Sequence, residues 1–88
     1  MSKMTFADDA WDEYLYWQSQ DKKTLKKINK LLKEVQRRPF KGTGKPEPLK
    51  GGSSNVWSRR INEKDRLVYE ITNDGIEVKQ CKGHYDDK

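Results

Sequence analysis

The sequence predicts an α+β domain in which an N-terminal helical hairpin packs on one face of a small, mainly antiparallel β-sheet. Apolar residues recur at helical spacing up to residue 35, and from residue 56 onward they alternate with a period of two. The stretch "RRPFKGTGKPEPLKGGSSN" between the two patterns is typical of a long loop, with a short extended piece near residues 47–50. With a short strand at residues 3–6, the expected order is β-α-α-β-β-β. We expect residues 1–88 to form one domain, with 86–88 as a loose tail.

Two amphipathic helices are expected to form the hairpin. The first lies in "DDAWDEYLYWQSQ", with Asp8 as its N-cap. Helical spacing on it connects Ala10, Trp11, Tyr14, Leu15 and Gln18. The second helix is marked by Leu25, Ile28, Leu31, Leu32 and Val35. Its opposite face is rich in lysine and is either simply solvated or attractive to nucleic acid, and Pro39 is expected to end it.

Side-chain alternation divides the later strands between two faces of the sheet. "VWSRRI", "RLVYEIT" and "IEVKQC" are the expected strands, and "NDG" is the turn between the last two. Residues expected to face the helices are Trp57, Ile61, Leu67, Tyr69, Ile71, Ile76 and Val78. Residues expected on the open face are Val56, Ser58, Arg60, Arg66, Val68 and Glu70. Strict alternation places Gln80 and His84 on the core side, so His84 reaches the open face only if the chain bulges or turns after Gln80, which Gly83 permits.

Composition narrows the environment and the partners. The net charge of +5 and a pI of about 9.4 favour a polyanionic partner, either nucleic acid or an acidic protein. A single cysteine cannot form an internal disulfide, which suits a reducing cytoplasm, and we expect Cys81 to be a small buried residue. One His and one Cys are too few for a His/Cys metal site. No signal peptide or membrane span is visible, and no cofactor is expected.

A few polar residues are candidates for chemistry. Glu47 lies between two prolines, so it is either an incidental loop carboxylate or a base held by stiff backbone. Arg59, Arg60 and Arg66 form a basic cluster that is either solvated or suited to bind phosphate. "GTGKPEP" is not a phosphate loop, because a proline follows its lysine. A terminal histidine is usually unimportant, but His84 is suited to proton transfer and the adjacent Tyr85 to stacking on a base.

Several blocks of the sequence resemble one family. "WDEYLYWQSQDKK", "KKINKLLKEVQRRPFKGTGKPEPLKG", "WSRRINEKDRLVYEIT" and the final "HY" are similar to the YoeB toxins of the RelE/ParE superfamily, from about Trp11 to Tyr85. The resemblance implies a RelE-like fold and a cytoplasmic, ribosome-dependent mRNA interferase that cuts mRNA in the ribosomal A site. It also implies an acidic antitoxin of the YefM type and operator DNA contacted through the antitoxin complex. A homodimer is compatible with the sequence.

The resemblance also assigns roles to residues. The family's general base falls on Glu47, its phosphate-binding arginine on Arg66, its general acid on His84 and its terminal aromatic on Tyr85. Supporting charges fall on Lys50 and Arg60. The implied reaction is metal-free attack of a ribose 2′-OH on the adjacent phosphate. In the family the His-Tyr pair typically ends the chain, whereas here Asp86, Asp87 and Lys88 follow, and their acids could raise the pKa of His84 or repel phosphate.

Two other functions fit the same sequence. A non-catalytic domain on this fold could inhibit by occupying RNA, the ribosome or a protein, because a fold does not determine an activity. A regulator that binds DNA directly is compatible with the positive charge, although no DNA-reading motif is visible. Cleaved mRNA distinguishes the enzyme from the first alternative, and a gel shift without antitoxin tests the second.

Overall fold

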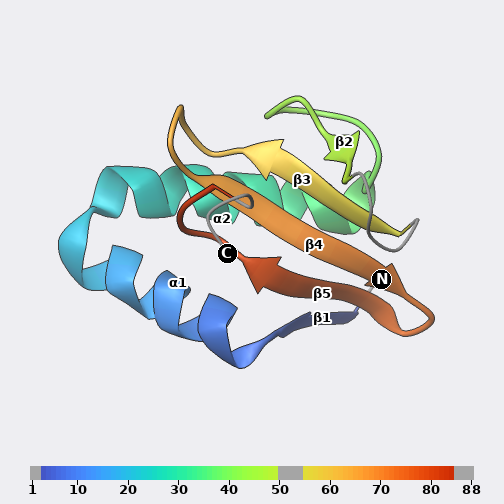
Figure 1. Cartoon of the computed structure of the whole chain (residues 1–88), viewed down its shortest axis with the longest axis horizontal. Helices are drawn as coiled ribbons and strands as arrows, with labels where there is room; N and C mark the ends of the chain where they lie inside the picture. Colours follow the sequence, from blue (N-terminus) through green and yellow to red (C-terminus); the bar gives the residue numbers. More distant parts are fainter. Residues whose placement is uncertain (1–2, 50–54, 85–88) are drawn as a thin grey trace.

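The fold is a five-stranded sheet with two helices packed against it (Figure 1). The computed structural model describes residues 3–49 and 55–84. In chain order the elements are β1 (Lys3–Phe6), α1 (Asp8–Gln20), α2 (Lys22–Arg37), β2 (Glu47–Pro48), β3 (Val56–Arg60), β4 (Arg66–Thr72) and β5 (Gly75–Gln80). The strand order is β1-β5-β4-β3-β2, with β1 parallel to β5 and the other three pairings antiparallel. The predicted fold class is confirmed, and the sheet is mixed.

The two helices are joined through one residue. Asp21 ends α1, where its N–H donates to Trp17 O at 3.0 Å, and it also caps α2. Its carboxylate accepts hydrogen bonds from the hydroxyl of Thr24 at 2.8 Å and from the Thr24 N–H at 3.1 Å, which lower the pKa of Asp21. The predicted cap of α1 is wrong: Ala7 occupies the N-cap position and Asp8 is the first helical residue. The predicted end of α2 is confirmed, because Arg38, the residue before Pro39, is its C-cap.

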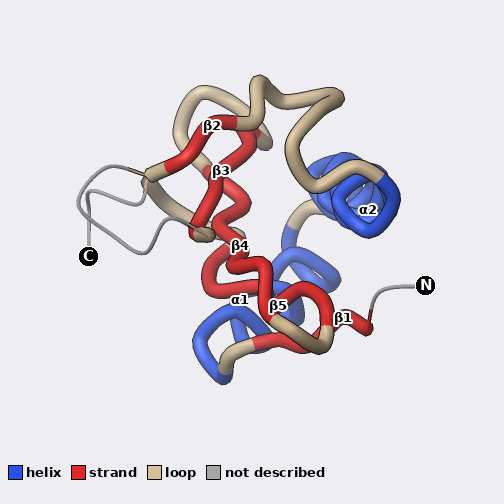
Figure 2. The backbone as a smooth tube through the Cα atoms, turned by 90° about the vertical axis from the view of Figure 1, so that its right-hand side faces the viewer, coloured by secondary structure: helices blue, strands red, loops and turns tan. Residues whose placement is uncertain are grey.

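The core lies between the helices and one face of the sheet. In Figure 2, α2 lies to one side of the strands, and α1 contacts β1 and β5. The predicted core residues of α2 are confirmed, since Ile28, Leu31, Leu32 and Val35 are all buried. The strands and the residues directly after them contribute to the core Ile61, Leu67, Tyr69, Ile76, Val78 and Cys81, with Trp57 and Ile71 packed against it. The predicted burial of Cys81 is therefore confirmed.

The predicted face of α1 is partly wrong. Trp11 and Leu15 are 46% and 41% exposed, whereas Trp17 is buried. Two side chains of α1 bind the backbone of Cys81: the Trp17 indole N–H donates to the Cys81 carbonyl at 2.8 Å, and the Cys81 N–H donates to the Glu13 carboxylate at 2.8 Å. These two bonds turn the side of the helix that carries residues 10, 13 and 17 toward the sheet.

Gly75 makes the close approach of β1 to β5 possible. Its φ of +146° suits glycine, and an added Cβ would lie 2.1 Å from the carbonyl oxygen of Lys3, its partner across the parallel pairing. We expect Gly75→Ala to lower the unfolding free energy by more than about 1 kcal/mol, measured by urea denaturation. Asp74→Ala, in the same turn, is the matched control. Equal unfolding free energies for Gly75→Ala and the parent would contradict this assignment.

Candidate active site

Glu47 lies on the edge strand β2. It is paired with Ser58 of β3, and β2 is extended by a hydrogen bond from Leu49 N to Val56 O at 3.0 Å. Directly opposed residues of antiparallel strands point to the same face. Because it is opposed to Ser58, Glu47 shares the face of Ser58, which is opposite to the face that packs on the helices, and its side chain is exposed. The short extended piece expected near residue 47 is confirmed.

Arg60 and Arg66 lie on this same face. They are directly opposed in the β3–β4 pairing, and Arg60 follows Ser58 by two residues, so its side chain has the same direction. Nη1 of Arg66 donates to the carbonyl of Asn62 at 2.6 Å and to the carbonyl of Asp65 at 3.1 Å, which holds the guanidinium over the β3–β4 turn. The prediction that Arg60 and Arg66 share a face is confirmed. The predicted three-arginine cluster is wrong, because Arg59 is buried on the other side.

A register shift in β5 brings the end of the chain toward this face. Tyr69 is opposite Val78, but Val68 is opposite Gln80, so β5 has one additional residue, Lys79. Such a bulge reverses the alternation of side chains beyond it. Gln80 therefore faces the side of Val68 and not the core, in contrast to the strict alternation expected from the sequence. The switch begins before Gln80, earlier than we predicted.

The segment after β5 is docked on the start of β4. Gly83 has a φ of +80°, as its expected role in a turn requires. Its N–H donates to the Asp65 carboxylate at 2.7 Å, and its carbonyl accepts from the N–H of Arg66 at 3.0 Å and from the Gln80 side chain at 3.0 Å. His84, which is half-buried, follows directly. The structure thus brings His84 next to Arg66.

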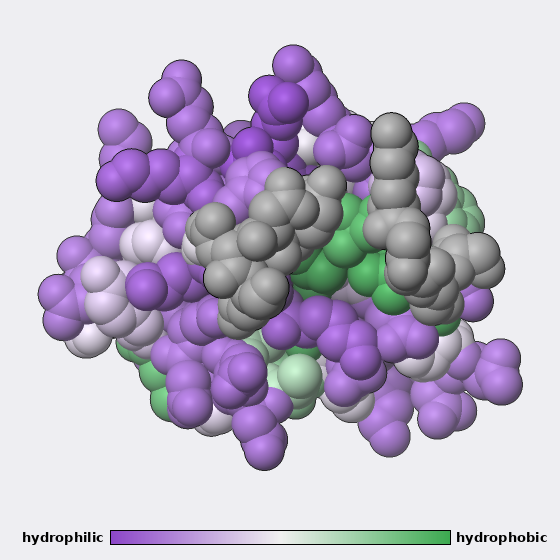
Figure 3. All heavy atoms as spheres, in the orientation of Figure 1, coloured by the Kyte–Doolittle hydropathy of each residue, from purple (hydrophilic) through white to green (hydrophobic). Residues whose placement is uncertain are grey.

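The middle of the face is not open as predicted. Ser58, Val68 and Gln80 form a row across β3, β4 and β5, and they are only 2%, 5% and 5% exposed. Val68 points away from the core, as predicted, but is buried outside it. Figure 3 views the molecule from the side opposite α2 and shows hydrophobic surface at the centre of this face, among polar side chains. The row forms a floor with Glu47 at one side and the Gly83–His84 segment at the other.

Two predicted site residues lie outside the described part of the chain. They are Lys50 and Tyr85, and the same holds for Asp86, Asp87 and Lys88. Conversely, sequence reasoning missed Asp65 and Gln80, the polar residues that hold Gly83. The available signal was weak: Asp65 comes just before a predicted strand and Gln80 lies within one, and only the three-dimensional structure shows that both are buried.

Ion pairs occupy the far part of the same face. Lys79 contacts Glu77 at 3.0 Å and Glu70 at 3.1 Å, and the hydrogen bond to Glu77, followed by that to Glu70, raises the pKa of Lys79. The two carboxylates thus share one cation, the ammonium group of Lys79. Negative charge is therefore partly compensated there, and the guanidinium groups of Arg60 and Arg66 lie at the other end of the face.

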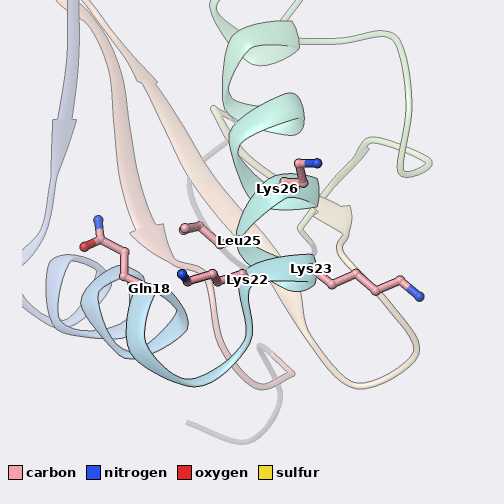
Figure 4. A pocket seen from close by; sticks show the side chains of 5 residues that line it. All are labelled: Gln18, Lys22, Lys23, Leu25 and Lys26. Carbon is pink, nitrogen blue, oxygen red and sulfur yellow. The ribbon is translucent and has the colours of Figure 1, made fainter.

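A surface hollow of about 710 Å³ lies where α1 meets α2. Figure 4 shows Gln18, Lys22, Lys23, Leu25 and Lys26 around it. None of the predicted site residues lines it.

Among residues 3–49 and 55–84, no group of three or more His, Cys, Asp and Glu side chains is placed to hold a metal ion. Neither described helix combines the length and apolar character needed to cross a bilayer.

Removing the Asp65 carboxylate should loosen the His84 segment. In Asp65→Ala, the N–H of Gly83 loses its acceptor, and we expect its amide hydrogen exchange to become at least about tenfold faster, equivalent to about 1.4 kcal/mol of local stability. The measurement is hydrogen exchange by NMR. Asp74→Ala, at the far end of β4, is the control. Unchanged exchange at Gly83 would show that this contact does not hold the segment.

Comparison with known proteins identifies the family. The sequence profile described as "YoeB-like toxin of bacterial type II toxin-antitoxin system" matches residues 6–85. Toxin YoeB of Escherichia coli (strain K12) is 52% identical over 83 residues, which cover 94% of this chain and 99% of the relative. A YoeB dimer from Staphylococcus aureus has a TM-score of 0.88 and 45% identity, covering 96% of this chain and 98% of the other. A YoeB–YefM complex from the same organism has a TM-score of 0.85 and 43% identity, covering 97% and 99%. The chain belongs to the family of YoeB-like toxins of bacterial type II toxin–antitoxin systems.

Proposed function

We propose that this toxin is a ribosome-dependent mRNA interferase that cuts mRNA in the ribosomal A site. The observation that supports it is the shared sheet face of Glu47, Arg60 and Arg66, with His84 docked beside Arg66. These four residues supply a carboxylate, two guanidinium groups and an imidazole, the groups that cleavage of an RNA phosphodiester requires. The charge of +5 suits an RNA partner.

The proposed reaction is an intramolecular transesterification. Glu47 accepts the proton of a ribose 2′-OH, whose oxygen attacks the adjacent phosphorus in line. Arg66, assisted by Arg60 and Lys50, stabilises the additional negative charge of the pentacoordinate phosphorus. His84 donates a proton to the departing 5′-oxygen, and Tyr85 stacks on a base. The products are a 2′,3′-cyclic phosphate and a 5′-hydroxyl, and each proton transfer has a side chain, so the mechanism uses no metal.

The spacing of the strands is compatible with Glu47 as the base and His84 as the acid. The row from Glu47 through Ser58 and Val68 crosses two strand intervals, and the segment of Gly83 adds a third. At about 4.8 Å per interval, the backbones that carry the base and the acid are on the order of 14 Å apart. That separation leaves room for a ribose and its phosphate between the two side chains, with Arg66 beside the segment of the acid.

In this proposal the ribosome holds the mRNA in the position required for cleavage. Holding an mRNA codon in one geometry removes much of the entropic barrier to in-line attack. We also propose an acidic YefM-type antitoxin as partner, in keeping with the Staphylococcus aureus complex, and operator DNA contacted through that complex. We also propose that the toxin forms a homodimer in the cytoplasm, because the similar YoeB structure from Staphylococcus aureus is a dimer.

Primer extension on a translated mRNA tests the proposal. In a reconstituted translation system we expect the toxin to produce new 5′ ends inside codons, each with a 5′-hydroxyl, only when ribosomes are present. An mRNA with a 2′-deoxy residue at the cleavage position should remain intact, because the nucleophile is missing. Blocked translation with intact mRNA would refute the enzyme and would support the non-catalytic inhibitor. A gel shift of operator DNA by the toxin alone would support direct DNA binding.

A further inference from the structure

Adjacent arginines in "WSRRI" have opposite environments. Arg60 is exposed on the candidate active-site face, whereas Arg59 points the other way and is 0% exposed. A buried guanidinium is costly unless all its donors are used. The positive charge of Arg59 is paired with the carboxylate of Glu34 on α2 at 3.2 Å. Arg59 therefore has a structural role in the interior, in contrast to the exposed Arg60.

All five N–H donors of Arg59 have acceptors. Nε donates to the Tyr69 hydroxyl at 3.2 Å, and Nη1 donates to Glu34 at 3.2 Å and to the carbonyl of Thr43 at 3.3 Å. Nη2 donates to the carbonyls of Lys41, at 2.6 Å, and of Arg38. Three of these acceptors are backbone carbonyls of the segment from residue 38 to residue 44. One side chain thus fixes the path of the chain as it leaves α2.

Two of the groups that accept from Arg59, the Tyr69 hydroxyl and the Glu34 carboxylate, also form their own hydrogen bonds with the same segment. The Tyr69 hydroxyl donates to Pro39 O at 2.6 Å, and Glu34 accepts from the N–H and the hydroxyl of Thr43 at 2.8 and 2.9 Å. The bonds from Thr43, with the charge of Arg59, lower the pKa of Glu34, while burial raises the pKa of Tyr69. Glu34 therefore remains a carboxylate and Tyr69 a neutral donor at neutral pH.

The segment ends close to the predicted base. The carbonyl of Gly44 accepts from the N–H of Arg60 at 2.7 Å, and a Cβ at Gly44 would lie 2.9 Å from the Arg60 carbonyl oxygen. Glu47 follows three residues later, after Lys45 with its φ of +53° and the rigid Pro46. Few soft dihedrals remain between the anchored Gly44 and Glu47, so displacement of the segment would move β2.

We propose that Arg59 is the positioning residue for Glu47: by holding residues 38–44 against β3, it sets where β2, and with it the carboxylate, lies on the active-site face. The catalytic part of this inference rests on the proposed function. A displacement of the base by about 1 Å can reduce a rate by about 100-fold. A purely apolar side chain at this position would leave Glu34 without its charge partner and the carbonyls of residues 38, 41 and 43 without their donors, which is destabilising.

Two variants test the proposal in the intact chain. Arg59→Lys retains the charge opposite Glu34 but has only three donors on one nitrogen. Tyr69→Phe removes a single hydroxyl that links Arg59 to Pro39, and it carries the test if Arg59→Lys does not fold. Tyr16→Phe, on the exposed side of α1, is the matched control. The first measurement is amide hydrogen exchange at Arg60 and Leu49, whose N–H groups bond Gly44 O and Val56 O. The second is cleavage of mRNA on programmed ribosomes, with kcat and KM determined separately.

We expect both variants to exchange faster at these two amides and to have a kcat reduced by about tenfold or more, with KM within about twofold of the parent. A merely destabilised enzyme would lose folded protein, not kcat per folded molecule. Parent-like exchange in both variants, or accelerated exchange with parent-like kcat, overturns the proposal. If the parent itself cuts no RNA, the proposed function fails, and the exchange measurement alone decides whether Arg59 holds β2.

Discussion

Glu47→Gln and His84→Gln are each expected to reduce mRNA cleavage by about 10²- to 10⁴-fold, the usual contribution of a general acid or base. Glutamine has the size of glutamate but cannot accept the proton of the 2′-OH, and at position 84 it cannot donate one to the leaving oxygen. Glu47 is exposed, so its replacement should change the unfolding free energy by no more than about 0.5 kcal/mol. Primer extension on translated mRNA measures cleavage, and urea denaturation confirms folding.

The double variant makes the test sharper. If base and acid act in the same transesterification, the double variant should cut about as slowly as the slower single variant, because groups that act as a unit are not additive. Asp12→Asn, which removes one exposed carboxylate from α1, is the control for the change in charge. Cleavage by both single variants at the rate of the parent would show that the assigned mechanism is wrong.

Sequence patterns predicted the elements of this fold because each has a local cause. The apolar repeat of α2, the proline after its end and the "NDG" turn before β5 depend on neighbouring residues only. The face of α1 was not predictable in this way. It depends on hydrogen bonds with Cys81, more than 60 residues away: the Trp17 indole donates to the Cys81 carbonyl, and the Cys81 N–H donates to the Glu13 carboxylate. A polar residue that faces inward contradicts the apolar pattern.

The candidate site shows the same division. Alternation correctly placed Arg60 and Arg66 together, since side-chain direction along a regular strand follows from the backbone. It failed at Gln80, because the bulge at Lys79 is a property of the β4–β5 register. The prediction wrongly grouped Arg59 with Arg60 and Arg66, and the contacts that Arg59 makes with the chain after α2 depend on how a loop returns to the sheet. The resemblance to the family, and not periodicity, assigned the catalytic roles.

Leu31→Ala is expected to have the largest effect on stability. Leu31 is fully buried in the core on α2, and removal of a buried leucine side chain costs about 2–5 kcal/mol through lost burial and the cavity left behind. A domain of 88 residues is stabilised by about 4–13 kcal/mol in total, so this one substitution can remove much of the folding free energy. Urea denaturation measures the loss.

Leu15→Ala is the matched control, because it is the same substitution on the other helix at a position that is 41% exposed. The apolar pattern of the sequence connected Leu15 with Ala10, whereas the structure turns Leu15 outward and Trp17 inward. We expect Leu15→Ala to cost less than about 1 kcal/mol, close to the effect of an ordinary surface substitution. A loss as large as that of Leu31→Ala would mean that α1 buries the face that the sequence pattern favoured. The hydrogen bonds of Glu13 and Trp17 to Cys81 would then not determine how this helix packs.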